Sequence, residues 1–232
     1  MSDTKYSGRA KRRIFRGVFL TAVHGNEPMP TLALASVDIP QIVANPQALA
    51  RGVRYVERDL NASFGMDGDQ YEIQRAKELM KIIDPQKLVV DFHTFSCVSE
   101  PFAIVVDPAM IPLASSLGVK HVVYMKHNIK AGHSLINYCQ GVSVEVGSHT
   151  DPRSFATTLS IVRRLEKYGI KPGKVHVYEV FGRIETQGSY TNFVETEGFV
   201  PILYGERAYP DQGFYGLQAH EITGTIVERG DL

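Results

Sequence analysis

The feature that most constrains the fold is an alternation, over most of the chain, of short apolar runs with segments of helical periodicity. The runs resemble central strands that are covered on both faces of a sheet, and they occupy residues 14–23, 88–92, 102–106, 122–124 and 142–146. Apolar residues recur at helical spacing from Tyr71 to Ile83 and from Phe155 to Leu165, with ends marked by Asp84-Pro85 and Gly169. The alternation predicts an α/β fold with a mixed, mostly parallel central sheet and helices on both faces.

The pattern changes after Pro172. Four strand-like segments separated by turns follow without a long helical period, at residues 175–180, 199–204, 214–217 and 222–227. We therefore expect three parts: a flexible basic tail over residues 1–13, an α/β domain over 14–170, and a small β-rich C-terminal domain over 171–232.

Composition excludes several classes of partner. The 232 residues carry 25 Lys plus Arg and 25 Asp plus Glu, so no net field attracts nucleic acid or an acidic membrane. The two cysteines form no C-x-x-C pair, and no segment approaches the roughly 20 apolar residues of a membrane span. We expect a cytoplasmic protein that acts on a small molecule; a homo-oligomer stays open.

A candidate metal site follows two of the apolar runs. His24 and Glu27 lie in a tight turn directly after the first run, and His93 closes the run 88–92. By itself H-x-x-E is common by chance, but both elements lie where a parallel sheet gathers its ligands. Two imidazoles and one carboxylate are the ligand set of a catalytic zinc that keeps a position for water. The sequence therefore predicts one Zn²⁺ per chain.

Two further carboxylates lie within apolar runs. Asp91 shares a strand face with His93 and is a candidate to orient its imidazole, although a solvated or strand-capping aspartate fits equally well. Glu145 lies in the middle of the run 142–146, where an ionised carboxylate is costly to bury. It is a candidate proton carrier, and a buried ion pair with an arginine is the alternative.

The segment from residue 52 to 61 offers two more candidates. Arg54 would supply a fixed cation for the oxyanion of a tetrahedral intermediate, and Asn61 a neutral donor for a substrate carboxylate or amide. Because such residues are commonplace near turns, neither is specific by itself.

Together these segments resemble the succinylglutamate desuccinylase and aspartoacylase family, a branch of the zinc carboxypeptidase-like hydrolases. His24 to Glu27 is similar to its H-G-N-E motif, Arg54 to Asn61 to its R-x-x-x-x-D-L-N-R segment, Asp91 to Thr94 to its D-L-H-x-T, and 144–147 to its I-E-V-G. Later, residues 206–209 are similar to its E-x-A-Y.

The resemblance implies a role for each matching residue. It implies zinc on His24, Glu27 and His93, a general base at Glu145, carbonyl polarisation by Arg54, and substrate contacts from Asn61 and Tyr209. Ala62 stands where the family has a carboxylate-binding arginine, and the chain is shorter than typical members. Arg58, at a position of the same parity as Ala62, is a candidate substitute cation.

These observations lead to one preferred function and two alternatives. We expect zinc-dependent hydrolysis of an N-acyl amino acid or related small amide, with a Glu general base. A carboxypeptidase-like peptidase or peptidoglycan amidase is the first alternative. A zinc-binding module with weakened turnover is the second.

Overall fold

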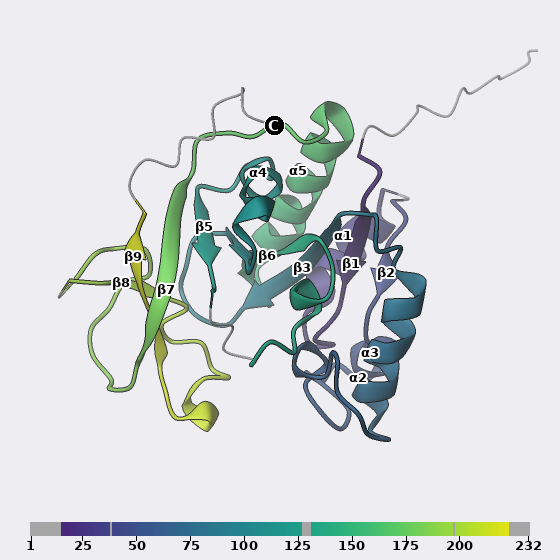
Figure 1. The fold of residues 1–232 in the computed structure, drawn as a ribbon, viewed down its shortest axis with the longest axis horizontal. Helices are drawn as coiled ribbons and strands as arrows, with labels where there is room; N and C mark the ends of the chain where they lie inside the picture. The colour runs from purple at the N-terminus through teal and green to yellow at the C-terminus, as the bar shows by residue number, and fades with distance from the viewer. Residues whose placement is uncertain (1–14, 38, 127–130, 197, 223–232) are drawn as a thin grey trace, which may run out of the picture.

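A computed structural model describes residues 15–37, 39–126, 131–196 and 198–222. Nine strands among these residues form one sheet in the order β2-β1-β3-β6-β4-β5-β7-β9-β8 (Figure 1). The strands are β1 (Val18–Thr21), β2 (Ile42–Val43), β3 (Val89–Phe95), β4 (Phe102–Val105), β5 (His121–Tyr124), β6 (Gly141–Ser148), β7 (His176–Ile184), β8 (Val200–Ile202) and β9 (Gly216–Glu221). The five apolar runs of residues 14–170 thus match β1, β3, β4, β5 and β6.

The sheet is mixed and mostly parallel, as predicted. Strands β2, β1, β3 and β6 run parallel to one another, and so do β4, β5 and β7. The direction reverses between β6 and β4, and again at β9, which is antiparallel to both β7 and β8.

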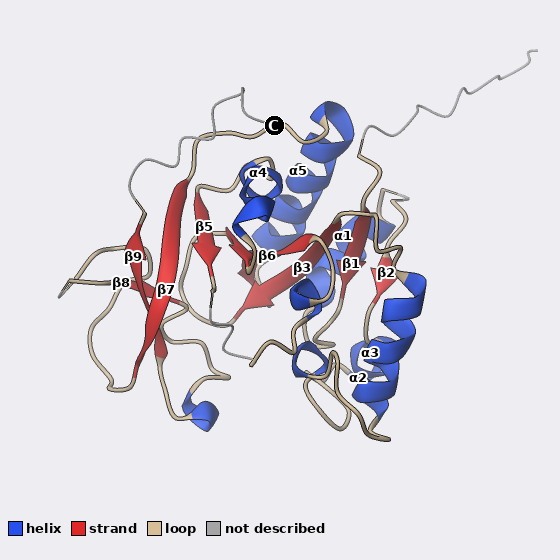
Figure 2. Cartoon of the chain, in the orientation of Figure 1, coloured by secondary structure: helices blue, strands red, loops and turns tan. Residues whose placement is uncertain are grey.

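Helices cover both faces of the sheet (Figure 2). Helices α1, α4 and α5 pack on the face to which Val90 of β3 points, and α3 packs on the face to which Val89 points. The helices are α1 (Pro28–Ala35), α2 (Pro46–Arg51), α3 (Tyr71–Ile82), α4 (Ile111–Ser115) and α5 (Pro152–Tyr168), with 3-10 turns η1 (Leu60–Ala62), η2 (Pro108–Met110), η3 (Leu135–Asn137) and η4 (Pro210–Gln212).

Local chemistry sets the ends of α5. The Asp151 side chain accepts a hydrogen bond from the Arg153 amide, and Pro152 occupies the first helical position, where a missing N–H costs nothing. Gly169 ends the helix at φ 65°, a backbone conformation that glycine tolerates.

The C-terminal strands are present, and they extend the same sheet. β7 pairs with β5 in parallel, and a buried cluster joins β3, β4 and β5 to β7, β8 and β9. The division at residue 170 stays a prediction. Residues 1–13 and all but Ile222 of the segment 222–227 lie outside the described residues. None of the described helices is long and apolar enough to cross a bilayer.

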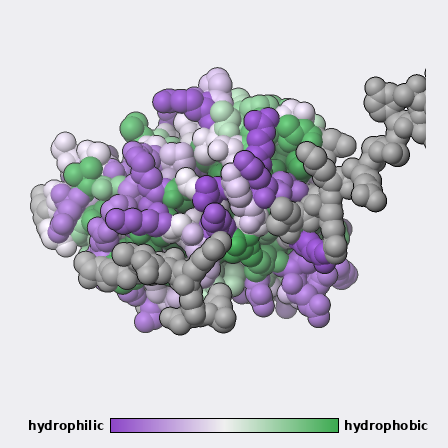
Figure 3. All heavy atoms as spheres, turned by 90° about the horizontal axis from the view of Figure 1, so that it is seen from above, coloured by the Kyte–Doolittle hydropathy of each residue, from purple (hydrophilic) through white to green (hydrophobic). Residues whose placement is uncertain are grey.

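The alternation of side chains along β3 and β6 places polar groups on one face of the sheet. Val142, Val144 and Val146 point into the cluster beneath α5, so Ser143 and Glu145 point to the opposite face. On the outer surface, hydrophilic and hydrophobic side chains are interspersed over the face that Figure 3 shows. The polar side chains of β3 and β6, such as His93 and Ser143, are therefore buried inside the fold on the face of the sheet that α3 covers.

Candidate active site

The turn after β1 fixes the first two candidate ligands. Ala22 adopts φ 54°, and the Gly25 amide donates to the Arg54 carbonyl at 3.1 Å. A Cβ atom on Gly25 would lie 2.1 Å from the Ala48 backbone, so only glycine fits this turn. Glu27 then becomes the N-cap residue of α1, with Pro28 at the first helical position.

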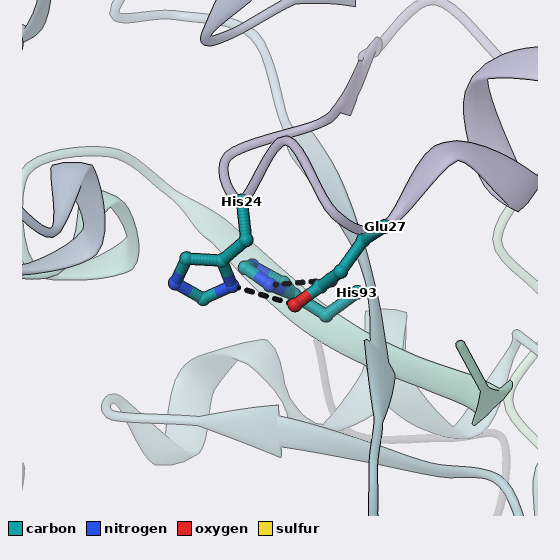
Figure 4. A group of neighbouring side chains, drawn as sticks. All are labelled: His24, Glu27 and His93. Carbon is teal, nitrogen blue, oxygen red and sulfur yellow. Dashed lines mark hydrogen bonds and ion pairs between the residues drawn. The ribbon is translucent and has the colours of Figure 1, made fainter. Parts of the chain in front are cut away.

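His24, Glu27 and His93 converge on one point (Figure 4). One ligand atom from each lies within 4.8 Å of the others, and all three side chains are buried. His24 Nδ1 is 2.7 Å from Glu27 Oε1, and His93 Nδ1 is 3.5 Å from Glu27 Oε2. The Glu27 carboxylate thus lies between two imidazoles that both present Nδ1 to it.

An aspartate contacts the Nε2 atom of each imidazole, on the side away from Glu27. His93 Nε2 is 2.7 Å from Asp91 Oδ2, and His24 Nε2 is 3.2 Å from Asp59 Oδ1. A carboxylate on the far nitrogen fixes the tautomer and the ring orientation of a metal-binding histidine. Asp91 is buried against the His93 imidazole rather than solvated, and Asp59 occupies the matching position beside His24.

The charges of this group support one another. Burial alone would raise the pKa of Glu27, but His24 and His93 beside it hold that pKa well below its ordinary value. Burial would lower the pKa of His93, but Asp91 and Glu27 raise it well above its ordinary value. Two imidazoles and a buried carboxylate match the donor set of a catalytic zinc, so these residues fit the predicted metal.

Glu145 lies directly beside His93, since the two are Cα partners in the pairing of β3 with β6. Its Oε2 atom is buried and has no hydrogen-bond partner among the described residues. Burial, together with Glu27 and Glu206, raises the pKa of Glu145 well above its ordinary value, against the opposing charges of His93 and Arg54. No ion pair between Glu145 and an arginine is found in the described part of the chain, which disfavours the structural alternative.

Arg54 bridges two carboxylates of the site. Its Nη2 lies 3.3 Å from Asp59 Oδ2 and its Nη1 lies 3.9 Å from Glu27 Oε1. Burial would lower the pKa of Arg54, but Asp59, Glu27 and Glu206 raise it, so the guanidinium stays charged.

A cavity of about 90 Å³ brings the predicted residues together. Apart from Asp91, every predicted site residue lines it: His24, Glu27, Arg54, Asn61, His93, Glu145 and Tyr209. Asn61 Oδ1 accepts a hydrogen bond from the Leu135 amide at 3.3 Å. Tyr209 is buried, and burial with Glu206 and Glu145 raises the pKa of its phenol.

The candidate substitute cation takes another position. Arg58 donates from Nη2 to the Ala62 carbonyl at 3.3 Å, and neither residue lines the cavity. The cationic side chain that the described residues present to the cavity is therefore Arg54.

The structure adds supporting residues that the sequence reasoning missed. The Thr94 amide donates to Glu27 Oε2 at 2.8 Å, and the Thr94 hydroxyl is 2.7 Å from His149 Nδ1. Glu206 accepts hydrogen bonds from the amide and the hydroxyl of Ser96, both at 2.8 Å. Asp59 and Glu206 stand inside the quoted motifs, and that position was the only signal for them.

Comparison with known proteins identifies the family of this chain. Residues 33–168, more than half of the chain, match the family described as Succinylglutamate desuccinylase/Aspartoacylase catalytic domain. The chain belongs to this family.

One motif position differs from the family pattern. Counted from Asp91, the threonine of the family's D-L-H-x-T falls at position 95, which is Phe95 here, so Thr94 is not its counterpart.

Curated members of the family resemble only part of the chain. The N-acyl-aromatic-L-amino acid amidohydrolase (carboxylate-forming) of Xenopus tropicalis is 39% identical over 118 residues, covering 40% of this chain and 36% of that protein. A probable aspartoacylase of Prochlorococcus marinus is 30% identical over 129 residues, covering 48% of this chain and 42% of that protein. The chain thus spans less than half the length of these relatives.

A solved structure extends the likeness to nearly the whole fold. Murine aminoacylase 3 superposes with a TM-score of 0.70 at 18% identity, covering 92% of this chain and 97% of that chain. At this identity the likeness shows the fold alone.

Proposed function

We propose that this protein is a zinc-dependent hydrolase that cleaves the amide bond of an N-acyl amino acid or a related small amide. One observation carries the proposal: the His24, Glu27 and His93 group and the unpartnered Oε2 atom of Glu145 open onto one cavity. The family of the chain and the names of its relatives, an amidohydrolase and a probable aspartoacylase, support it.

The side chains divide the chemistry between them. A zinc ion held by His24, Glu27 and His93 would acidify water and polarise the amide carbonyl. Glu145 takes the proton of the attacking water, since its carboxylate is unpaired and its raised pKa brings it toward the working range of a proton carrier. Arg54 supplies positive charge to the oxyanion that forms as the water oxygen bonds to the carbonyl carbon.

Collapse of the tetrahedral intermediate completes the reaction. The C–N bond breaks, and Glu145 passes its proton to the leaving nitrogen. The products are a carboxylic acid and an amine, and Glu145 returns to its starting state. Asn61 and Tyr209 line the same cavity and are proposed to contact the substrate.

The test is a hydrolysis screen of the zinc-loaded protein against N-acyl amino acids and short peptides, with the free amine detected directly. We expect about one zinc per chain, release of amine from N-acyl amino acids, and loss of both zinc and activity in His93→Ala. Faster cleavage of peptides would favour the peptidase alternative. Retained zinc without turnover on any substrate would favour a binding module.

A further inference from the structure

The cavity has a polar half and an apolar half. The candidate metal ligands come from the turn after β1 and from β3, and Glu145 follows on β6. Beyond Glu145, the strand order continues through β4 to β5, and the lining becomes apolar. Ile104, Val106 and Met125, on or directly after β4 and β5, supply this apolar half. The other apolar residues of the lining are Phe95 on β3, Ile136 in η3, and Leu203 and Ala208 after β8.

We propose that this apolar half is a subsite for an uncharged, apolar side chain on the amino acid whose nitrogen leaves. The inference rests on the proposed function, because Glu145 must then reach the leaving nitrogen. Since Glu145 lies between the metal ligands and the apolar half in the strand order, the group carried by that nitrogen extends toward β4 and β5.

Charge supports the same substrate class. The described lining residues include one guanidinium group, that of Arg54, and three carboxylates, those of Glu27, Glu145 and Glu206. Arg54 is already paired with Asp59 and lies 3.9 Å from Glu27. The carboxylate of an aspartyl or glutamyl side chain would therefore lose its hydration without gaining a free cation.

Two departures from the family motifs act in the same direction. Ala62 replaces an arginine, and Phe95 occupies the position of a threonine. Phe95 is buried and stacks on Phe102 with ring centroids 6.2 Å apart and planes at 16°, which fixes its ring in the cavity wall. Both departures make the surroundings of the site less polar.

The test measures binding and specificity separately. Calorimetry on zinc-loaded Glu145→Gln compares N-acetyl-L-leucine with N-acetyl-L-aspartate, so that no turnover disturbs the binding signal. We expect the leucine compound to bind at least about 10-fold more tightly, because even one methylene in an apolar pocket is worth about 10-fold or more. In the wild type, kcat/KM should follow the same order.

Variants of Ile104, which is half-buried in the wall, locate the subsite. Adding Ile104→Ala to Glu145→Gln should weaken binding of N-acetyl-L-leucine about 10-fold and leave N-acetyl-L-aspartate nearly unchanged. Ile104→Arg, which introduces a cation, should shift the preference toward the aspartate compound. Val98→Ala, at a side chain that is 93% exposed, is the matched control and should change neither.

The outcomes separate this inference from the proposed function. Equal or tighter binding of N-acetyl-L-aspartate, or equal losses for both compounds in Ile104→Ala, would overturn the subsite. A leucine preference in binding without amine release from the wild type would support the subsite and count against the hydrolase.

Discussion

Asp91→Asn tests whether the aspartate behind His93 strengthens the metal site. Asp91 is fully buried, and its Oδ2 atom lies 2.7 Å from His93 Nε2 and accepts from the Ser143 hydroxyl at 3.3 Å. Asparagine preserves the shape and leaves an amide oxygen that can accept from His93. The substitution therefore removes the negative charge and replaces Oδ1, which is buried without a hydrogen-bond partner among the described residues, by an NH2 group.

The magnitude follows from the type of hydrogen bond that is lost. A hydrogen bond to a charged group contributes about 1.5–3 kcal/mol and a neutral one about 0.5–1.5 kcal/mol, so the exchange removes roughly 1–2 kcal/mol. Because about 1.4 kcal/mol is tenfold, zinc should bind about 10-fold more weakly, toward the lower end of the 10–100-fold range typical of such partners.

The pH dependence of this loss distinguishes a tuning role from a structural one. In the zinc-free protein Asp91 raises the pKa of His93, so a proton competes with the metal more strongly in the wild type than in Asp91→Asn. The deficit of the variant should therefore be largest at pH 8 and narrow toward pH 6. A competition titration with a fluorescent zinc chelator measures it at both values.

Asp67→Asn is the control, since the Asp67 side chain is fully exposed and, among the described residues, pairs with Lys77 Nζ at 3.0 Å. Zinc affinity of folded Asp91→Asn within twofold of wild type at pH 8 would refute the reasoning. So would a deficit that does not change with pH, because a general loosening of the site has no reason to depend on the protonation of His93.

Three further predictions follow from the site. Glu145→Gln should retain about one zinc per chain by metal analysis while kcat falls about 100-fold or more; near-normal kcat would make Glu145 structural. Gly25→Ala should drive a Cβ into the Ala48 backbone, cost roughly 2–3 kcal/mol and lower Tm by roughly 5–10 °C, and an unchanged Tm would mean that the turn relaxes freely. In chelator-treated protein, the raised pKa of His93 stabilises the fold at pH values below the unfolded-state pKa, near 6.5, and this stability is lost as pH rises through the folded-state pKa. The lowered pKa of Glu27 adds stability that is lost as pH falls below its unfolded-state pKa, about 4.5. The zinc-induced rise in Tm should therefore grow from pH 6 to pH 8, and a flat response in thermal scans would contradict this linkage.

Sequence periodicity was enough to predict the interior of the fold. Strands such as β3 and β6 are apolar on both faces apart from the polar residues of the site, so their runs were visible. Gly169 marked the C-terminal end of α5, whereas its start at Pro152 was not predicted. β2 was missed because it consists of Ile42 and Val43 alone, too short for any period. The reversal between β6 and β4 was also beyond reach, since it depends on pairing between distant segments.

The candidate site was predictable where a residue and its neighbours share one motif. His24 and Glu27 lie in one turn, and Asp91 and His93 on one strand, so their proximity follows from local geometry. Glu206 is different, because it hydrogen-bonds to Ser96, 110 residues away. Such a contact is set by how β8 and β9 join the sheet, and no local pattern records it.

The strand order explains why the candidate ligands meet where they do. The chain leaves β1 toward β2 at the sheet edge and then returns to form β3 on the other side of β1. The connecting helices lie on opposite faces, since α1 joins β1 to β2 on one face and α3 leads from β2 back to β3 on the other. A crevice opens at such a reversal, and open α/β sheets bind their ligands there. His24 and Glu27 follow β1 and His93 lies near the end of β3, so the two ligand-bearing elements border this crevice. The position of the candidate metal site is therefore a consequence of the order of three strands, one of which is only two residues long.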